Sequence, residues 1–314
     1  MAVRPAGAAC LHDAVDLPDG LTSRPLTMTD ARAVFEVMAA QEQEDIGTVE
    51  IEEADIVGDW QRPSFDVAAS TVGIFDGPRL VAYGEVGGDQ RSDAAVHPAY
   101  RGRGLGTAVA EWIRDTARSR GEKVVGMPVP QGSPGDRLLA SLGYHVRWES
   151  WVLELPPGRE IEPQPLPEGY AVRTALSEAE RRAVHEVVED AFLEWSERDR
   201  SSYEDFEART VRRPGFEPWQ LRVVVDPDGA TVGACLTQLA TDFAYVAQLA
   251  VRRDRRGLGL ARALLVDAFA NGRQHGASRF ELSTDSRTGA LGLYEKVGME
   301  VTHTWVNRAI ALPH

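Results

Sequence analysis

Residues 251–261 read Val251-Arg252-Arg253-Asp254-Arg255-Arg256-Gly257-Leu258-Gly259-Leu260-Ala261. An apolar run over residues 245–251 leads into them, and a helical pattern follows whose apolar side carries Ala263, Leu264, Leu265, Ala268 and Phe269. This order predicts a strand, a glycine-rich turn and a helix. Such a turn directs free backbone N–H groups at one point, with the positive end of the helix dipole behind them. The segment therefore predicts a site for an anion with several oxygens, most naturally a pyrophosphate.

Three kinds of glycine-rich loop fit that description in outline. A Walker loop ends in Gly-Lys-Ser/Thr, and the chain's two lysines, Lys123 and Lys296, lie elsewhere. The dinucleotide fingerprint needs three glycines at G-x-G-x-x-G spacing, which residues 251–261 lack. The remaining pattern, Arg256-x-x-Gly259-x-Ala261, resembles the acetyl-CoA loop of the GCN5-related N-acetyltransferase (GNAT) superfamily, Gln/Arg-x-x-Gly-x-Gly/Ala.

A second copy of the pattern lies in the first half of the chain. Residues 94–107 contain Arg101-x-x-Gly104-x-Gly106, at the same distance after a valine, Val96. Two copies indicate a tandem GNAT protein. The resemblance implies an α/β (α+β) fold with two GNAT domains, each a mixed, mostly antiparallel sheet with a splayed central strand pair and helices on both faces.

The order of expected elements repeats after about 150 residues, as in a duplicated domain. We expect a flexible tail over 1–19, an N-terminal domain over 20–155, a proline-rich linker over 156–168 and a C-terminal domain over 169–314. Ser177-x-x-Glu180 predicts a capping box that opens a helix. Residues 67–75 and 80–86 predict a hairpin, and 146–155 and 301–312 predict the strand that closes each half. Residues 41–59 and 193–218 fall where the family places its acceptor lid, and the first of these predicts a second helix plus loop.

The composition of the chain limits the kinds of substrate and binding partner that we expect. The 314-residue chain carries 34 basic and 48 acidic residues, a formal charge of −14, which argues against binding of nucleic acid. An acidic surface suits a cationic amine or a basic peptide as substrate, and it also serves solubility alone. Cys10 and Cys235 are the only cysteines, so we expect neither a disulfide framework nor a metal site. No stretch predicts a membrane span or signal peptide, and the expected location is the cytoplasm. A tandem chain is compatible with a monomer that forms an internal pseudo-dimer, or with a homodimer.

Acetyl transfer from a thioester to an amine requires that CoA be held and that the carbonyl oxygen be stabilised. By resemblance, the strand residues Leu249, Ala250 and Val251 contact the pantetheine arm, and the Leu249 N–H binds the carbonyl oxygen, a contact worth roughly 3 kcal/mol. The pyrophosphate is expected on backbone N–H groups of Arg256, Gly257, Leu258, Gly259, Leu260 and Ala261. The corresponding residues of the first half are Ala94, Val96, Arg101, Gly102, Arg103, Gly104, Leu105 and Gly106.

The family's second signature is an Asn, then a helix that carries Leu-Tyr, then Gly-Phe. In the second half, Tyr294 falls on the tyrosine that serves as general acid towards the CoA sulfur, and Ser286 stands where Asn is usual. The first half has Leu139 at the tyrosine's place, and leucine has no proton to give. We therefore expect the chemistry in the C-terminal domain and a degenerate N-terminal domain.

The general base and the acceptor remain open. Family members often carry a Glu on or before the splayed strand, where this chain has Tyr245 and Gln248, neither of them a carboxylate. Asp242, just before the strand, and Glu217 are candidates for the base, and His303 on the closing strand is a weaker one. The plan resembles that of the mycothiol synthases, tandem members that acetylate a cysteinyl sugar with their C-terminal half. Other small amines are equally open as acceptors. A non-catalytic acyl-CoA-binding sensor and an assembly module are the alternatives from other classes.

Overall fold

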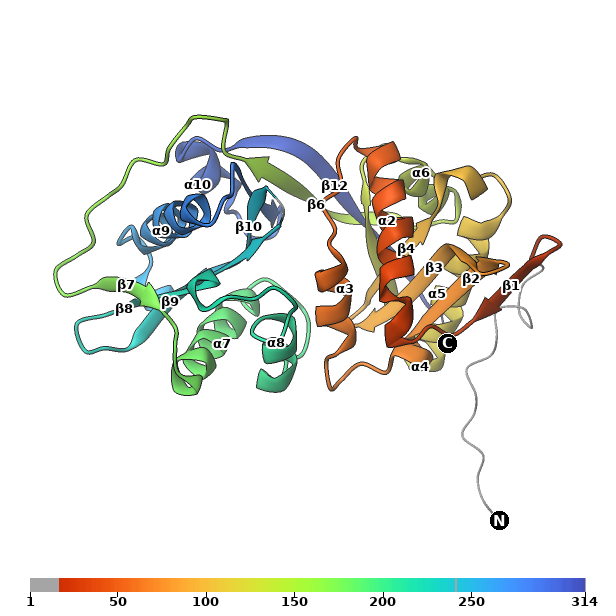
Figure 1. Ribbon diagram of the computed structural model, residues 1–314. Helices are drawn as coiled ribbons and strands as arrows, with labels where there is room; N and C mark the ends of the chain where they lie inside the picture. The colour runs from red at the N-terminus through yellow and green to blue at the C-terminus, as the bar shows by residue number, and fades with distance from the viewer. Residues whose placement is uncertain (1–16, 241, 314) are drawn as a thin grey trace, which may run out of the picture. The chain divides into compact units, whose positions relative to one another are not determined.

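The computed structural model describes residues 17–240 and 242–313. Most of the predicted tail lies outside the described residues. The chain divides into two compact units: unit 1 runs to Glu149 and resumes at Trp305, and unit 2 runs from Ser150 to Thr304. In Figure 1 the elements before Glu149 run from red to yellow-green, and those of unit 2 from green to blue.

Unit 1 has the sheet order β1-β2-β3-β4-β5-β12, and each strand pairs with the next. Its elements are β1 (Leu21–Arg24), η1 (Met28–Asp30), α2 (Ala31–Asp45), α3 (Glu53–Trp60), α4 (Val67–Ser70), β2 (Thr71–Asp76), β3 (Arg79–Gly88), β4 (Arg91–Val96), η2 (Pro98–Tyr100), α5 (Leu105–Ser119), β5 (Val124–Pro130) and α6 (Pro134–Ser141).

Unit 2 has the sheet order β6-β11-β10-β9-β8-β7. Its elements are β7 (Ala171–Thr174), α7 (Glu178–Phe192), α8 (Tyr203–Arg209), η3 (Pro218–Gln220), β8 (Leu221–Val225), β9 (Thr231–Leu239), β10 (Phe243–Val251), η4 (Arg253–Arg255), α9 (Leu260–Gln274), β11 (Arg279–Asp285) and α10 (Leu291–Lys296). Strands β6 (His145–Glu154) and β12 (Glu300–Ala311) each belong partly to unit 1 and partly to unit 2. The predicted capping box is present: the Ser177 hydroxyl accepts from the Glu180 N–H at the start of α7.

The strands that close the two halves do not fall within the predicted domain boundaries. Residues Ser150–Glu154 of β6 pair antiparallel with β11 in unit 2, and residues Trp305–Ala311 of β12 pair antiparallel with β5 in unit 1. The sequence places each closing strand with its own half. Alternation of side chains identifies a strand but does not say which sheet it completes, because that is decided by long-range pairing.

Two local predictions are also corrected. Residues Val67–Ser70 form the short helix α4 rather than the start of a strand, because Asp66 caps it by accepting from the Ala69 N–H at 3.1 Å. Helix α2 continues to Asp45, so the segment 41–59 begins inside a helix and only its second part forms a new one, α3.

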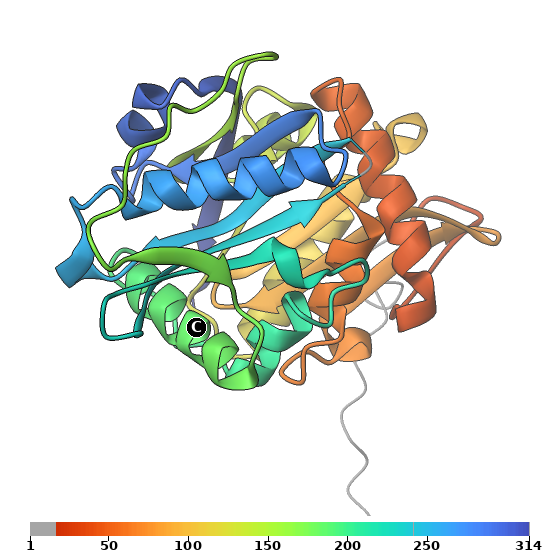
Figure 2. The same ribbon diagram turned by 60° about the vertical axis from the view of Figure 1, so that its left-hand side comes forward.

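Each unit packs helices on both faces of its strands. In unit 2, α9 covers the face that carries Cys235, Val246 and Leu249, and α7 and α8 cover the face that carries Leu236 and Ala250. Figure 2 shows α9, in blue, along one face of these strands and α7, in green, on the other. In unit 1, the core under α5 and α6 is separate from the core under α2 and α3. The predicted mixed sheet with helices on both faces is confirmed.

The central strand pair separates in both units. In unit 2, β10 runs parallel to β11 from Phe243 opposite Arg279 to Val246 opposite Leu282, and no further pairing follows among the described residues. In unit 1, β4 and β5 pair in parallel at Arg91 and Gly126. The later part of each strand therefore keeps a neighbour on one edge alone, which confirms the splayed pair.

No helix in residues 17–240 or 242–313 is long and apolar enough to cross a membrane. Within the same ranges, no three His, Cys, Asp or Glu side chains come together in a way that could hold a metal ion.

Candidate functional site

The site in unit 2 begins at the free edge of β10. The Arg252 N–H donates to the Val232 carbonyl at 2.9 Å, towards β9. Because N–H groups alternate along a strand, those of Leu249 and Val251 point the other way, where β11 has left. A bulge between Val246 and Gln248 marks the point of separation. We call this part of β10 the unpaired edge. Among the described residues, no side chain accepts a hydrogen bond from Leu249 or Val251 there.

The glycine-rich loop has the backbone that an anion site needs. Gly257 and Gly259 both have φ of +78°, in the left-handed region that favours glycine, and Gly259 is the N-cap of α9. The first hydrogen bond of the helix runs from the Ala263 N–H, which donates to the Gly259 carbonyl at 3.0 Å. The N–H groups of Leu260 and Ala261 precede it, so they have no partner within the helix and are available to a ligand. The loop residues named from the sequence thus lie together at one helix N-terminus.

The side chain of Arg256 is hydrogen-bonded within the protein and holds the loop in place. Its guanidinium donates to both carboxylate oxygens of Glu194, at 2.9 and 2.7 Å, and its Nε donates to the Val251 carbonyl at 3.1 Å. These bonds fix the loop against the end of β10. The Arg256 backbone N–H donates to the Arg253 carbonyl at 3.5 Å. The expected contact of Arg256 with a pyrophosphate therefore requires this long hydrogen bond to be replaced.

The proline-rich linker lies next to the glycine-rich loop, which the sequence did not indicate. A Cβ on Gly259 would lie 3.2 Å from Gln164 Oε1, and Arg262 on α9 donates to the Glu162 carbonyl at 2.8 Å. The segment around Gln164 therefore crosses the first turn of α9. A proline-rich composition predicts a linker but carries no signal for this position.

Tyr294 lies in the buried cluster between the strands and α9. Its side chain is 8% exposed and shares the cluster with Cys235 and with the partly buried Leu249. Burial, with smaller contributions from Cys235 and Tyr245, raises the pKa of Tyr294 to about 12. The hydroxyl is therefore protonated at neutral pH and able to donate. Ser286, in contrast, is exposed in the turn after β11.

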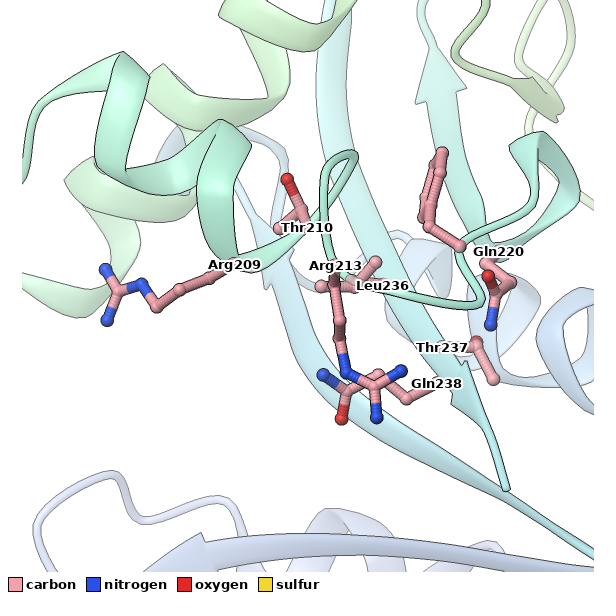
Figure 3. A pocket seen from close by; sticks show the side chains of 8 residues that line it. Arg209, Thr210, Arg213, Gln220, Leu236, Thr237 and Gln238 are labelled. Carbon is pink, nitrogen blue, oxygen red and sulfur yellow. The ribbon is translucent and has the colours of Figure 1, made fainter. Parts of the chain in front are cut away.

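A small hollow lies on the opposite face of the same strands (Figure 3). It has a volume of about 180 Å³, including space open to solvent, and is lined by Arg209, Thr210, Arg213, Phe216, Gln220, Leu236, Thr237 and Gln238. Leu236 stands opposite Gln248, the residue before Leu249, so the hollow adjoins the start of the unpaired edge. Arg213 is 6% exposed and extends across β9 towards Gln238, whereas Arg209 points away from the strands. Part of this lining comes from residues 193–218, the expected acceptor segment.

The candidate bases are held in other contacts. Glu217 accepts from the Trp219 indole N–H at 2.7 Å and is exposed, and the Asp242 carbonyl accepts from Ser278 and Arg279 at the turn before β10. His303 is half-buried on β12. On β10 itself, the Tyr245 hydroxyl lies 2.7 Å from the Ser283 hydroxyl. None of these contacts links a carboxylate to Leu249 or Tyr294.

Unit 1 repeats the loop with different contacts. Gly102 and Gly104 have φ of +76° and +83°, and Gly104 is the N-cap of α5, as Gly259 is of α9. The Val96 N–H, equivalent to that of Val251, donates to the Gln41 side chain at 3.0 Å. Leu139, at the place of Tyr294, is 3% exposed in the core under α5. The remaining first-half candidates, Ala94, Arg101, Arg103, Leu105 and Gly106, lie on β4, the loop and the start of α5.

Comparisons with known proteins match both halves. The model of the acetyltransferase (GNAT) family matches residues 34–144 and again residues 181–299, and both ranges end before the closing strands. A mycothiol acetyltransferase from Salinispora tropica is 30% identical over 227 residues, 68% of this chain and 71% of that protein. One from Thermobispora bispora is 28% identical over 240 residues, 72% and 78% of the two chains.

Solved structures show the same architecture over nearly the whole chain. A GCN5-related N-acetyltransferase from Sphaerobacter thermophilus has a TM-score of 0.73 at 28% identity and covers 95% of this chain and 98% of its own. A tandem GNAT protein from the clavulanic acid biosynthesis pathway has a TM-score of 0.72 at 20% identity, with 94% and 99% covered. The second likeness is one of fold alone.

Proposed function

The chain belongs to the acetyltransferase (GNAT) family, and from that premise we propose that unit 2 transfers an acetyl group from acetyl-CoA to a primary amine of a small molecule. The amine attacks directly, in a complex that holds both substrates. One observation carries the proposal: the unpaired edge of β10 ends in a left-handed glycine loop at a helix N-terminus, and a buried tyrosine lies in the same cluster as that edge.

The residues of unit 2 divide the reaction between them. The loop N–H groups from Arg256 to Ala261 hold the pyrophosphate, and the Leu249 and Val251 N–H groups hold the acetyl-pantetheine arm. The amine nitrogen bonds to the thioester carbon while the Leu249 N–H stabilises the oxygen as it gains charge. The C–S bond then breaks, Tyr294 gives its proton to the thiolate, and the amine releases one proton to a base or to water. One proton taken up from water restores the Tyr294 hydroxyl. The products are an amide and CoA thiol, so the protons balance.

The names of the relatives support a particular acceptor as a second candidate. Mycothiol acetyltransferases cover about two thirds of the chain at 30% identity, which supports a cysteinyl amino sugar of the mycothiol precursor type. The carboxylate that family members often carry on the splayed strand is absent, since Tyr245 and Gln248 occupy it, and residues 193–218 carry no signature that identifies an acceptor. We therefore keep the broader class, a small-molecule amine, as the proposal.

The test is release of thiol from acetyl-CoA with a panel of acceptors: the mycothiol precursor, polyamines, aminoglycosides, amino acids and peptides. The protein is wild type or carries Tyr294→Phe. Turnover with one acceptor class, which falls in the variant while CoA still binds, supports the proposal and names the substrate. Turnover that ignores the substitution contradicts the assignment of Tyr294. Tight CoA binding without turnover for any acceptor favours a sensor, and no CoA binding favours an assembly module.

A further inference from the structure

The unpaired edge of unit 1 has a side chain in the place where unit 2 has none. In β4, the His97 N–H donates to the Val81 carbonyl at 2.9 Å, so the Val96 N–H points away from β3. Strand β5 has already separated on that side. The Val96 N–H is nevertheless bonded, because Gln41 Oε1 on α2 accepts from it at 3.0 Å. A side-chain amide oxygen thus holds the strand N–H that a pantetheine amide oxygen would take.

The helices of the two units align closely enough to locate the difference. Helices α2 and α7 both have 15 residues, and each has a glutamate at its twelfth position, Glu42 and Glu189. Both glutamates accept from backbone N–H groups of the segment after their helix, Glu42 from Glu50 and Ile51, and Glu189 from Ser201. By this alignment, the position of Gln41 is Val188 in α7. Val188 is buried among apolar side chains and has no group to place on β10.

A second contact ties the same helix to the loop of unit 1. Arg101 donates to both oxygens of Asp45 at 2.8 and 2.9 Å, and the Asp45 side chain is 4% exposed. The equivalent Arg256 pairs with Glu194, which lies beyond the end of α7 and is 31% exposed. The position of Asp45 in α7 is Phe192. Helix α2 therefore holds both the strand edge and the loop arginine of unit 1, whereas α7 holds neither.

We propose that Gln41 and Asp45 form a built-in latch in unit 1, so that the chain binds one acyl-CoA, in unit 2. In this latch Gln41 occupies the strand N–H that acyl-CoA would take, and Asp45 ties helix α2 to Arg101 and so keeps Gln41 in place. The proposal rests on the proposed function in one respect, that the excluded ligand is acyl-CoA. It gives the first half a reason to be inactive, as we expect it to be, that is separate from the absence of a tyrosine at Leu139. Opening the latch restores a binding site and leaves the half without its acid.

Calorimetric titration of the full-length chain with CoA tests the stoichiometry. We expect one CoA per chain for wild type and two for Gln41→Ala or for Gln41→Ala with Asp45→Ala. Gln43→Ala is the matched control, since Gln43 lies on the same helix but is exposed and donates to the Gly47 carbonyl at 3.0 Å. The Gln43→Ala variant should bind one CoA per chain, as wild type does. Two CoA per wild-type chain, or no added site in either latch variant, overturns the latch.

Amide hydrogen exchange locates the effect. In wild type without CoA, the Val96 amide should be protected, and CoA should leave it unchanged while it slows Leu249 and Val251. Gln41→Ala should make Val96 exchange faster, and Gln43→Ala should not. A Val96 amide that exchanges freely in wild type contradicts the proposal. Failure of the proposed function would give a different result in the titration. Wild type would then bind no CoA, while a latch variant could still gain one site.

Discussion

Tyr294 and Cys235 share one buried cluster, and Cys235 stands opposite Leu249 in the pairing of β9 with β10. The three side chains come from α10, β9 and β10, so the fold places a protonated phenol in the same buried cluster as the strand position expected to bind the thioester carbonyl. Burial raises the pKa of the Cys235 thiol to about 12, which leaves it neutral. Both groups are therefore protonated at neutral pH, and of the two the Tyr294 hydroxyl is the stronger hydrogen-bond donor.

Tyr294→Phe should lower kcat by about 10²–10³ with little change in CoA affinity, because it removes a proton donor and keeps the ring that packs in the cluster. Since burial raises the pKa of Tyr294 to about 12, wild type should show no loss of kcat from this group up to about pH 10. Steady-state kinetics over pH, with CoA binding measured separately, checks both points. A variant that keeps its kcat would move the proton donor elsewhere.

Gly259→Val should raise KM for acetyl-CoA about tenfold or more, because a side chain there is strained at φ +78° and meets Gln164, so the loop N–H groups must move. Gly104→Val is the matched control in unit 1. Gly104 is also a helix N-cap, with φ of +83°, and its substitution introduces the same strain. We expect Gly104→Val to leave KM unchanged. Equal effects of the two variants would contradict the assignment of the CoA site to unit 2.

Tyr144→Phe should stabilise unit 1 by about 1 kcal/mol, because the hydroxyl of this 3% exposed side chain is buried without a hydrogen-bond partner among the described residues. Denaturant unfolding of the full chain measures the change. Activity should not change, since Tyr144 lies in the core under α5 and not at the unpaired edge of β10. A destabilised variant would mean that the hydroxyl has a partner in solution.

The features that sequence could predict are those with a local pattern. Gly259 and Gly104 are recognised by their spacing from an arginine and a strand, and the structure gives both the left-handed φ that the loop requires. The contrast between Tyr294 and Leu139 is equally local, because a glycine follows each at the same distance, Gly298 and Gly143.

The features that sequence missed depend on contacts between distant segments. Gln41 and Val96 are separated by 55 positions, and nothing in a helical pattern says that a polar side chain on it reaches a strand N–H. The exchange of closing strands is similar, since residues 150–154 would alternate in the same way in either sheet. Gln164 was missed for the same reason.

Glu85 should make the stability of unit 1 fall as pH rises. Its carboxylate accepts from the Trp60 indole N–H at 2.7 Å in a buried site. Burial, with Asp93 and Asp59 adding to it and Trp60 and Arg91 opposing it, raises the pKa of Glu85 to about 8 from 4.5. Below pH 4.5 the folded and unfolded chains both carry the proton. Between pH 4.5 and 8 the unfolded chain has released it and the folded chain has not, so the free energy of unfolding decreases across this window.

Glu85→Gln removes this titration and keeps an oxygen for Trp60. The loss of unfolding free energy between pH 5 and pH 9 should therefore be smaller in the variant than in wild type, by on the order of 3 kcal/mol. Urea unfolding of the full chain at the two pH values measures it. Glu36→Gln is the control, because Glu36 is exposed on α2 and pairs with Arg32 at the surface, and it should keep the wild-type dependence. If wild type and Glu85→Gln respond alike, Glu85 is ionised throughout this range, and the burial of its carboxylate does not hold the proton.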